Sequence, residues 1–339
     1  MGFGIAGATI AWQLYLRKIP FIIIASPTNT CSRAAAGLIN PIVFKRLNMS
    51  WMATDLLPAA DLFYDEVENL LNHSIRRYHS IVKIFNSIED ENNWMVKKAN
   101  CTYSQYFGNI KQTNIPKVDI PFGTGTVNSI GHLNTSSYID LSKVFFRQNG
   151  IKFLEEHFEH NQIKGSNYRS ISFDKAIFCE GFGLKKNPFF NYLPLNGTHG
   201  DTLIIRTKNY NFDGVLNKNM YVMPMSNNLY KLGASINWDK KEAEITESGK
   251  NNLLDRLKAF AHFDFEIIEQ QAGIRPTVID RRPLLGSHHE HGQLAIFNGL
   301  GTKGVMLAPY FSQQLIDNLT ENRPLNDEVN ITRFEKFLM

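Results

Sequence analysis

The sequence predicts a mixed α/β fold, α+β overall, in which a domain with a parallel sheet is interleaved with a domain built on an antiparallel sheet. A glycine-rich loop at the N-terminus leads into an apolar helix and a buried strand, as in a βαβ unit. Residues 201–238 alternate between apolar and polar side chains, as half-exposed antiparallel strands do. Near the C-terminus, a second glycine-rich loop joins a buried strand to a helix.

The first loop has the spacing of a Rossmann-like dinucleotide-binding turn, because Gly2, Gly4 and Gly7 follow the pattern G-x-G-x-x-G. Gly2 would allow a tight turn, Gly4 the approach of a pyrophosphate to the backbone, and Gly7 the close packing of helix on sheet. Ile5 and Ala6 would place N–H groups at the positive end of the helix dipole, which favours phosphate. The alternative is a tight turn whose glycines serve packing alone.

A helix is expected directly after this loop, because apolar residues recur at helical spacing as far as Leu14. Pro20 ends that helix, and residues 21–24 are predicted to form a buried parallel strand. Dinucleotide sites usually have an acidic residue near the end of this strand, where it binds the ribose. Here Ser26 or Asn29 could offer one hydrogen bond instead.

The rest of the chain is expected to alternate helices with short strands. In order, we expect a helix at 49–71, short strands between about 73 and 125 (80–85 and 94–96 among them), a helix at 138–148, strands at 151–158 and 172–179, antiparallel strands at 202–205, 220–225 and 229–236, a helix at about 248–261, a strand at 294–298 and a helix from 305 to about 319. We therefore predict a discontinuous nucleotide-binding domain of residues 1–48, 126–200 and 265–339, and a sheet-rich domain of residues 49–125 and 201–264.

Small residues fill the segment from Cys31 to Pro41, which includes Ser32, Ala36 and Gly37. Side chains of this size let the backbone lie close against a flat group. The alternative is that the segment is only the start of a helix rich in small residues.

Arg275 lies between Gly273 and Pro276, in rigid backbone. A guanidinium group suits two-pronged recognition of a carboxylate, so we predict that Arg275 binds one. The alternative is a structural arginine that forms an ion pair with Asp280.

The last glycine-rich loop opens the C-terminal helix and contains Gly301, Thr302, Lys303, Gly304 and Val305. It again offers backbone N–H donors and the positive end of a helix dipole to a ligand, and Lys303 adds a full charge. The alternative is a plain helix cap.

The composition excludes several classes of protein. A hydrophobic content of 43% supports a core, and no run of about 18 apolar residues suits a membrane span. Neither a secretory signal pattern nor a Cys spacing typical of disulfides or zinc occurs, which favours a reducing, cytoplasmic setting. The net charge of +4 is spread along the chain, so a nucleic-acid partner is not expected.

Three other patterns associated with catalysis do not indicate an active site in this sequence. His288, His289 and His291 cluster around Glu290, but a solvated loop is expected there and no metal site is predicted. The G-x-S-x-G turn of serine hydrolases and the Walker loop of nucleotide hydrolases do not occur.

Taken in order, these segments resemble the FAD-dependent amine and amino-acid oxidases. That family includes D-amino-acid oxidase, glycine oxidase, sarcosine oxidase and the oxidase half of a bifunctional tRNA-modifying enzyme. The resemblance rests on residues 2–7, 32–41, 179–181, 273–276 with Asp280 and Pro283, and 299–309. Residues 36–41 are most similar to the glycine-oxidase branch. One departure is that Met1 alone precedes Gly2, so the strand that usually leads into the loop is expected to be lacking.

The resemblance implies an FAD-binding domain interrupted by an antiparallel substrate domain. It also implies a role for each predicted site residue: Gly2, Gly4 and Gly7 at the pyrophosphate, Gly181 near the phosphates, the backbone of Phe158 near the adenine, Ala36 and Gly37 near the isoalloxazine, and Gly301, Lys303, Gly304 and Val305 at the pyrimidine edge of the flavin. Arg275 would lie near the flavin and bind a substrate carboxylate.

The function implied is an FAD-dependent oxidoreductase that oxidises a small amine or amino acid by hydride transfer to flavin N5. Arg275 and Lys303 are the residues expected to contribute to catalysis. Oxygen or a quinone would accept the electrons. The alternatives are a flavin dehydrogenase that passes electrons to a quinone or a protein, and a degenerate, non-catalytic flavoprotein-like fold.

Overall fold

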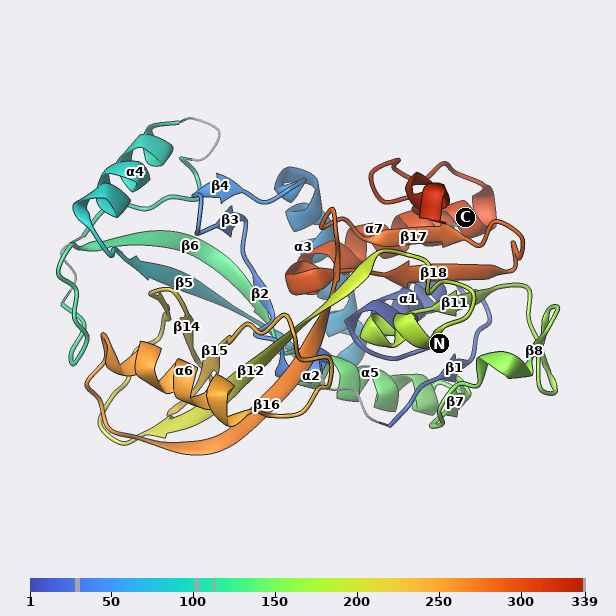
Figure 1. The fold of residues 1–339 in the computed structure, drawn as a ribbon, viewed down its shortest axis with the longest axis horizontal. Helices are drawn as coiled ribbons and strands as arrows, with labels where there is room; N and C mark the ends of the chain where they lie inside the picture. The colour runs from blue at the N-terminus through green and yellow to red at the C-terminus, as the bar shows by residue number, and fades with distance from the viewer. Residues whose placement is uncertain (28–30, 101–103, 112–113, 338–339) are drawn as a thin grey trace.

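A computed structural model describes residues 1–27, 31–100, 104–111 and 114–337. Its helices are α1 (Ile5–Leu16), α2 (Cys31–Ala34), α3 (Ala53–Leu71), α4 (Ile88–Ala99), α5 (Thr135–Gln148), α6 (Glu247–Lys258) and α7 (Gly304–Glu321). Short 3-10 turns include η2 (Gly181–Lys186) and η3 (Gly301–Lys303). The elongated molecule has a large sheet with α4 and α6 at one end, and α1, α5 and α7 at the other (Figure 1).

The large sheet has eight strands. In spatial order they are β16 (Phe265–Val278), β12 (Leu195–Thr207), β15 (Leu229–Gly233), β14 (Tyr221–Pro224), β13 (Val215–Asn217), β5 (Arg76–Ile84), β6 (Thr124–Leu133) and β2 (Leu38–Ile39). Every neighbouring pair is antiparallel except β13 and β5. The long strands β12 and β16 run from one end of the molecule into the other, and thereby connect the large sheet to the helices (Figure 1).

Smaller sheets lie among the helices. A parallel pair joins β1 (Ile23–Ile24) to β7 (Phe153–Leu154), and a second sheet places β18 (Leu294–Asn298) between β11 (Ala176–Phe178) and β17 (Leu284–Ser287). The remaining strands are β3 (Ile42–Val43) and β4 (Asn48–Met49), which form a hairpin, and β8 (Ile163–Lys164), β9 (Asn167–Tyr168) and β10 (Ile171–Ser172), which form a separate small sheet.

Met1 and Gly2 lie between β1 and β11 and hydrogen-bond to both. The Gly2 N–H donates to the Ile24 carbonyl at 2.9 Å, and the Met1 amino group donates to the Ile177 carbonyl at 2.6 Å. The Cys179 N–H in turn donates to the Met1 carbonyl at 2.7 Å. Two residues therefore occupy the place where the sequence analysis expected no strand, and they connect the two small sheets.

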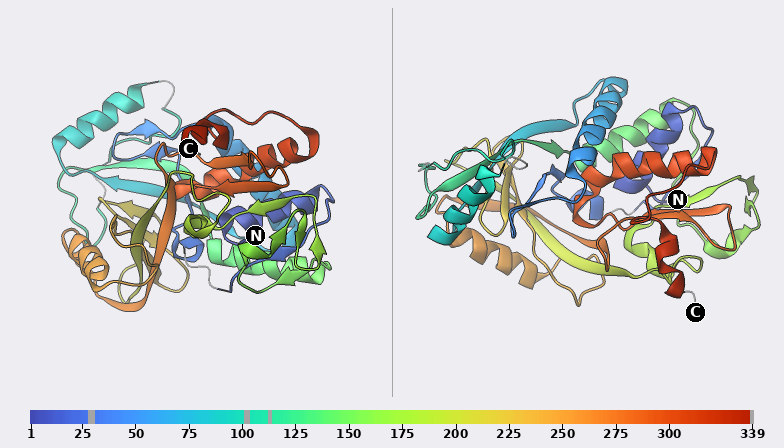
Figure 2. Two further views of the ribbon diagram at one scale, coloured as in Figure 1. Left: turned by 45° about the vertical axis from the view of Figure 1, so that its right-hand side comes forward. Right: turned by 90° about the horizontal axis from the view of Figure 1, so that it is seen from above.

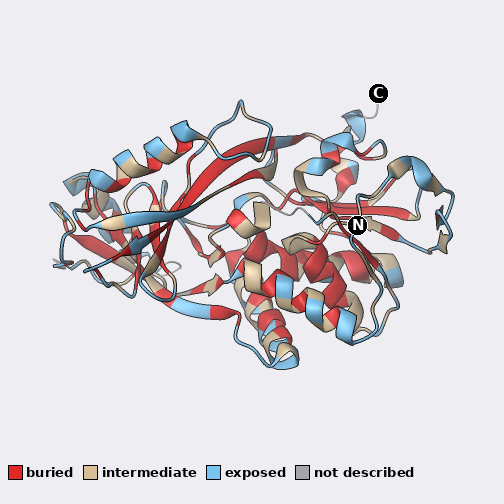
Figure 3. Cartoon of the chain, turned by 90° about the horizontal axis from the view of Figure 1, so that it is seen from below, coloured by how far each residue is buried: buried red, intermediate tan, exposed pale blue. Residues whose placement is uncertain are grey.

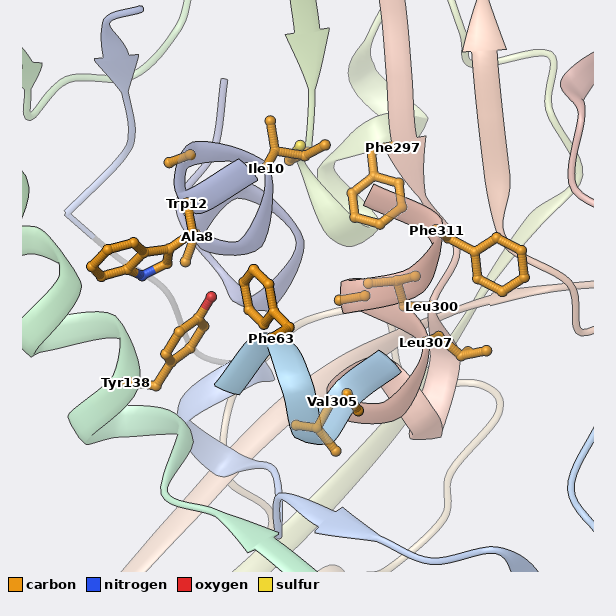
Figure 4. Packing of buried hydrophobic residues seen from close by; sticks show 14 of the residues in the cluster. Ala8, Ile10, Trp12, Phe63, Tyr138, Phe297, Leu300, Val305, Leu307 and Phe311 are labelled. Carbon is orange, nitrogen blue, oxygen red and sulfur yellow. The ribbon is translucent and has the colours of Figure 1, made fainter. Parts of the chain in front are cut away.

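The main helical core forms where α1, α3, α5 and α7 meet, as Figure 4 shows. Helix α1 is apolar on every side, and Ala8 and Trp12 on it are fully buried. Polar groups inside this core are paired: the Trp12 indole N–H donates to Ser142 Oγ of α5 at 2.7 Å, and the Tyr64 hydroxyl of α3 donates to the Val305 carbonyl of α7 at 2.8 Å. The helices are therefore fixed by specific hydrogen bonds as well as by apolar contact.

Two further clusters stabilise the large sheet. Helix α6 covers one face over Leu203 and Leu232, while Trp94 of α4 lies over Gly125 on the opposite side. Both helices lie at the sheet end of the molecule in the view from above, away from α1 and α7 (Figure 2). Buried residues concentrate in the central helices and strands, and exposed residues in the peripheral helices and loops (Figure 3).

Most expected elements are confirmed, including the strand at 294–298 and the helices at 248–261 and 305–319. The expected strand at 94–96 is wrong, because these residues lie in α4. The signals for that helix are at its ends: Ser87 accepts a hydrogen bond from the Asp90 N–H, acidic residues fill the first turn, and Lys97 and Lys98 lie in the last.

Three expected boundaries also differ. Helix α3 begins only at Ala53, because residues 48–49 form β4. The strand expected at 151–158 ends at Leu154, so Phe158 lies in the loop that follows it, and the strand expected at 172–179 is divided between β10 and β11. Helix α3 falls in the predicted substrate domain, yet it packs against α7 and α5. The proposed domain boundaries otherwise stay a prediction.

The glycine at position 7 provides a test of this packing. A Cβ atom there would lie 2.8 Å from the Gly2 carbonyl carbon and closer still to its oxygen, so the backbone would have to move. We expect Gly7→Ala to destabilise the protein by about 1–3 kcal/mol, measured by urea unfolding. Gly292→Ala is the matched control, because no heavy atom lies within 4 Å of a Cβ there. Equal stability of the two variants would contradict the packing role of Gly7.

Candidate functional site

The N-termini of α1 and α7 lie next to each other at the centre of the molecule. A Cβ atom on Gly304, the first residue of α7, would lie 3.1 Å from Cγ2 of Ile5, the first residue of α1. The first N–H groups of a helix have no acceptor within that helix, and the dipole adds partial positive charge there. Two such ends in contact form a region suited to a phosphate or another anion.

The turns before these helices depend on glycine. Gly2 has a φ of +85°, and a Cβ atom there would lie 2.9 Å from the Cys179 carbonyl carbon. Gly181 and Gly301 each have a φ of +57°, but no heavy atom lies within 4 Å of a Cβ at Gly181, and only Thr277 Oγ1 reaches 4.0 Å at Gly301. The first glycine is therefore needed for packing, whereas the other two border open space.

Helix α2 lies between the helical core and the large sheet. Ser32 Oγ accepts a hydrogen bond from the Ile5 N–H at 3.0 Å, at the N-terminus of α1. The Arg33 guanidinium pairs with Asp140 of α5 through two hydrogen bonds, one of 2.9 Å. Farther along, Gly37 has a φ of +69°, and a Cβ atom there would lie 3.0 Å from the Leu133 carbonyl carbon. The segment with the predicted residues Ser32, Ala36 and Gly37 is thus held from both sides.

A buried lysine holds the same segment from the sheet. Lys231 of β15 is 6% exposed, and its ammonium donates to the carbonyls of Arg33 at 3.0 Å and Ala35 at 3.1 Å. Burial lowers the pKa of Lys231 to about 8, and the negative charge of Glu269 partly opposes this shift. Lys231 was not predicted from the sequence, although a charged residue within an apolar strand is a signal that could have singled it out.

The two residues predicted near the ribose and adenine follow the paired strands β1 and β7. Ser26 is half-buried just after β1. Phe158 follows β7 by four residues, and its ring stacks on Tyr168 with centroids 4.2 Å apart. Asn29 lies outside the described residues. Both described residues are therefore at the carboxyl end of the parallel pair, where α/β folds bind ligands.

Arg275 lies on the face of the large sheet that α2 covers. Its guanidinium extends over Gly200 of β12, where a Cβ atom would lie 2.5 Å from Nη1. Its own hydrogen bonds are long: 3.5 Å to the Thr198 carbonyl and 3.4 Å to the His199 carbonyl. The alternative pairing is wrong, because Asp280 pairs with Arg333 at 2.9 Å. Within the described residues, no carboxylate forms an ion pair with Arg275.

A tyrosine that the sequence analysis missed lies close to this arginine. Tyr221 of β14 extends over Gly233 of β15, where a Cβ atom would lie 2.6 Å from the Tyr221 Cζ atom. Burial raises the pKa of Tyr221, and the positive charge of Arg275 opposes that shift. Burial likewise raises the pKa of the Cys31 thiol to about 11, again opposed by Arg275. A guanidinium and a neutral phenol therefore face the same region beside α2.

Lys303 precedes the first residue of α7. Its ammonium donates to Ser50 Oγ, and burial lowers the pKa of Lys303 to about 8. Thr302 is exposed, while Gly304 and Val305 are buried in the first turn of α7. The loop therefore places a lysine, whose hydrogen-bond partner is the neutral Ser50 hydroxyl, at a helix N-terminus, as the sequence predicted.

The histidine cluster is not a solvated loop throughout. His288 is buried, and its Nδ1 accepts hydrogen bonds from the N–H groups of Glu290 and His291, both at 3.1 Å. Across residues 1–27, 31–100, 104–111 and 114–337, no group of three or more His, Cys, Asp or Glu side chains could hold a metal ion. The same residues contain no helix long and apolar enough to cross a membrane.

Comparison with known proteins identifies the family. The family model described as "DAO: FAD dependent oxidoreductase" matches residues 1–317, so the chain belongs to this family of FAD-dependent oxidoreductases. A curated relative is the tRNA 5-methylaminomethyl-2-thiouridine biosynthesis bifunctional protein MnmC of Idiomarina loihiensis, 26% identical over 156 residues. That alignment covers 43% of this chain and 25% of the relative, so the chain matches about a quarter of the curated relative's length.

Solved structures show the same fold. Glycine oxidase from Geobacillus kaustophilus has a TM-score of 0.82 at 18% identity, covering 98% of this chain and 96% of that one. L-proline dehydrogenase from P. horikoshii has a TM-score of 0.74 at 15% identity, covering 99% and 96%. FAD-bound L-alpha-glycerophosphate oxidase from Mycoplasma pneumoniae has a TM-score of 0.69 at 16% identity, covering 96% and 94%.

FAD is the cofactor of the family, and the geometry of this chain suits it. The two adjoining helix N-termini supply donors and positive potential for its phosphates. The open space beside Gly181 and Gly301 is a cradle into which any larger side chain would project. The mixed α/β fold with an FAD-binding part and a substrate part is likewise that of glycine oxidase.

The lysine on β15 supplies a test of the site's electrostatics. Because the folded state lowers the pKa of Lys231 to about 8, the unfolded chain binds more protons above that pH. The stability of the wild-type protein relative to Lys231→Met should therefore rise with pH between about 8 and 10, by at most about 1.4 kcal/mol per pH unit. Urea unfolding at a series of pH values measures it, with the exposed Lys208→Met as the control for loss of one charge. A pH-independent difference would refute this assignment.

Proposed function

We propose that the protein oxidises a small amine or amino acid that carries a carboxylate, and that Arg275 binds this carboxylate. The observation that carries the proposal is a guanidinium with only long hydrogen bonds, 3.4 and 3.5 Å, and no acidic partner among the described residues. A buried or half-buried arginine normally has a charged or strongly polar partner. A substrate carboxylate would supply it.

The surroundings of Arg275 favour an anionic ligand with a reacting group beside it. Gly200 and Gly233 leave room above two adjacent strands, so the side chains of Arg275 and Tyr221 can lie there. Tyr221 is neutral at physiological pH, since burial raises its pKa, and can donate a second hydrogen bond to a carboxylate. A carboxylate held by both groups would have a fixed orientation, which is the main requirement for hydride transfer.

For FAD we propose the binding residues expected from the sequence. The pyrophosphate would be held by Gly2, Gly4, Ile5, Ala6 and Gly7, together with Gly181. The adenosine side would be held by Ser26 and the backbone of Phe158. The isoalloxazine would lie near Ser32, Ala36 and Gly37, and its pyrimidine edge would be held by Gly301, Thr302, Lys303, Gly304 and Val305. For the two glycine-rich loops, the support is their position at the adjoining N-termini of α1 and α7. For Ser26 and Phe158, it is their position after the paired strands β1 and β7. One adjustment concerns Ser32, whose hydroxyl accepts from the Ile5 N–H and so competes with a phosphate for that donor.

When bound, FAD accepts a hydride at N5, which here would come from the carbon bearing the amine. The residues of this chain orient the substrate through Arg275 and Tyr221, and Lys303 would supply positive charge where electron density accumulates. Hydride loss converts the amine to an imine, which water hydrolyses to a carbonyl compound and ammonia or a smaller amine.

The direct test is anaerobic reduction of the FAD-loaded protein by a panel of amino acids, N-substituted glycines and the matching esters. Bleaching of the flavin absorbance by acids but not by their esters is the expected result. Reoxidation by oxygen compared with a soluble quinone then identifies the acceptor class. If L-alpha-glycerophosphate reduced the flavin and no amine did, the proposed substrate class would be wrong.

The arginine should contribute through its charge and its geometry together. Arg275→Ala should weaken carboxylate substrates by about 2–4 kcal/mol, since the carboxylate loses a charge-assisted, two-pronged partner. Arg275→Lys should recover only part of this loss. Steady-state kinetics against an acid and its ester measures the effect. Arg206→Ala is the control, because Arg206 lies on β12 as an exposed partner of Glu266. Unchanged affinity in Arg275→Ala would remove this residue from the site.

The lysine before α7 should affect the reduction potential of bound FAD. If Lys303 has a pKa of about 8 in the oxidised protein, and flavin reduction raises that pKa, reduction takes up one extra proton above pH 8. The potential should then fall with pH more steeply than in Lys303→Met, by about 30 mV per pH unit. Spectroscopic titration between pH 6.5 and 9.5 measures both slopes. Parallel slopes would show that Lys303 does not respond to the flavin.

A further inference from the structure

A cavity of about 200 Å³ lies at the far end of the large sheet, away from the helix N-termini of the FAD site. Its walls come from the turn of the β3–β4 hairpin, from the end of β5 and from Asp90, Asn93 and Lys97 along α4. Figure 1 shows these elements together beside α4. Nothing in the proposed function uses this cavity.

The side chains that line the cavity are mostly cationic. Lys45 and Arg46 come from the hairpin turn, Lys83 from β5 and Lys97 from α4, whereas Asp90 is the single acidic residue of the lining. These cations therefore outnumber the one carboxylate, so the cavity has a positive potential.

Lys83 distinguishes this cavity from an ordinary basic surface, because its side chain is buried. It is only 7% exposed, and it lines the cavity. Its ammonium forms no hydrogen bond or ion pair with any residue in the described part of the chain. Lys231, which is as deeply buried, donates instead to two carbonyls.

The charged groups nearby do not compensate Lys83. Asp90 attracts it, but Asp90 Oδ2 already accepts from the backbone N–H of Asn86 at 3.0 Å and from its side-chain amide at 2.9 Å. Burial has the largest effect and lowers the pKa of Lys83, and repulsion from Lys218, which directly follows the neighbouring strand β13, lowers it further. A buried ammonium without a partner is costly unless a ligand supplies the missing negative charge.

We propose that this cavity binds a small phosphate, either inorganic phosphate or the phosphate group of a small metabolite, with Lys83 as its buried partner. A dianion matches the excess of cations better than a single carboxylate does. The aromatic wall of Phe85 suits an organic group attached to the phosphate. A cavity of about 200 Å³ with the buried Lys83 in its lining favours a small ligand over a nucleic-acid backbone, which needs an extended basic track.

The test uses the FAD-loaded protein in a phosphate-free buffer, with isothermal calorimetry and thermal unfolding against inorganic phosphate, phenyl phosphate and uncharged phenol. We expect both phosphates to bind and to raise the unfolding temperature, and phenol to do neither. Tighter binding of phenyl phosphate would assign the site to a metabolite, and equal binding would assign it to inorganic phosphate.

Lys83→Met should weaken phosphate binding at least tenfold while unfolding at the same or a higher temperature without phosphate, because a buried unpaired charge has been removed. Lys218→Met removes a neighbouring charge that does not line the cavity, and Arg275→Ala removes the predicted anion-binding group of the FAD site. Both should bind phosphate as the wild type does. The proposal is overturned if Lys83→Met keeps full affinity, if Arg275→Ala abolishes binding, or if only long polyanions bind.

Discussion

The close approach of Gly2 and Gly7 is the constraint on which the rest of the site depends. Because neither residue has a Cβ atom, the N-terminus of α1 can lie directly against the turn after β11. The same turn lets Met1 and Gly2 hydrogen-bond to β1 and β11 at once. Helix α7 then packs along α1, so that both helices begin at one place. A larger side chain at either glycine would separate the helix ends and lower the positive electrostatic potential available to an FAD pyrophosphate.

The geometry of the site also depends on the short segment around α2, which is held by contacts from the helical core and from the large sheet. From the helical side, the Ile5 N–H and Asp140 fix Ser32 and Arg33. From the sheet side, Lys231 fixes the carbonyls at the end of α2, at the cost of desolvating an ammonium. The backbone that would face the flavin is therefore preorganised by contacts from two directions. The position of the large sheet, and with it Arg275, is fixed relative to the helices by the same contacts.

The sequence predicted the elements and glycine turns well because these are local features. Both glycine loops, the strand β18 and the helix α7 follow from spacing and periodicity within about 20 residues. Arg275 was singled out for a related reason, since it lies in a rigid local motif, and its role stays a prediction. Tyr221, Lys231 and Ser50 were missed because their roles arise from strand pairing and loop contacts across the fold. The strand expected at 94–96 was wrong because the cap at Ser87 and the acidic first turn favour a helix over this short apolar run.

The fold alone does not specify the substrate, so under the proposed function its identity would depend on side chains of the large sheet. Structures with TM-scores from 0.69 to 0.82 carry names that refer to glycine, L-proline and L-alpha-glycerophosphate. These similarities lie below 20% identity and concern the arrangement of the chain alone. Under the proposed function, the side chains that extend from the sheet face beside α2 would select the substrate. In this chain those are a guanidinium without an acidic partner among the described residues and a phenol kept neutral by burial, both above glycines. If the proposed function holds, such a pair would discriminate by charge and direction, and would favour an amine that carries a carboxylate over one that lacks it.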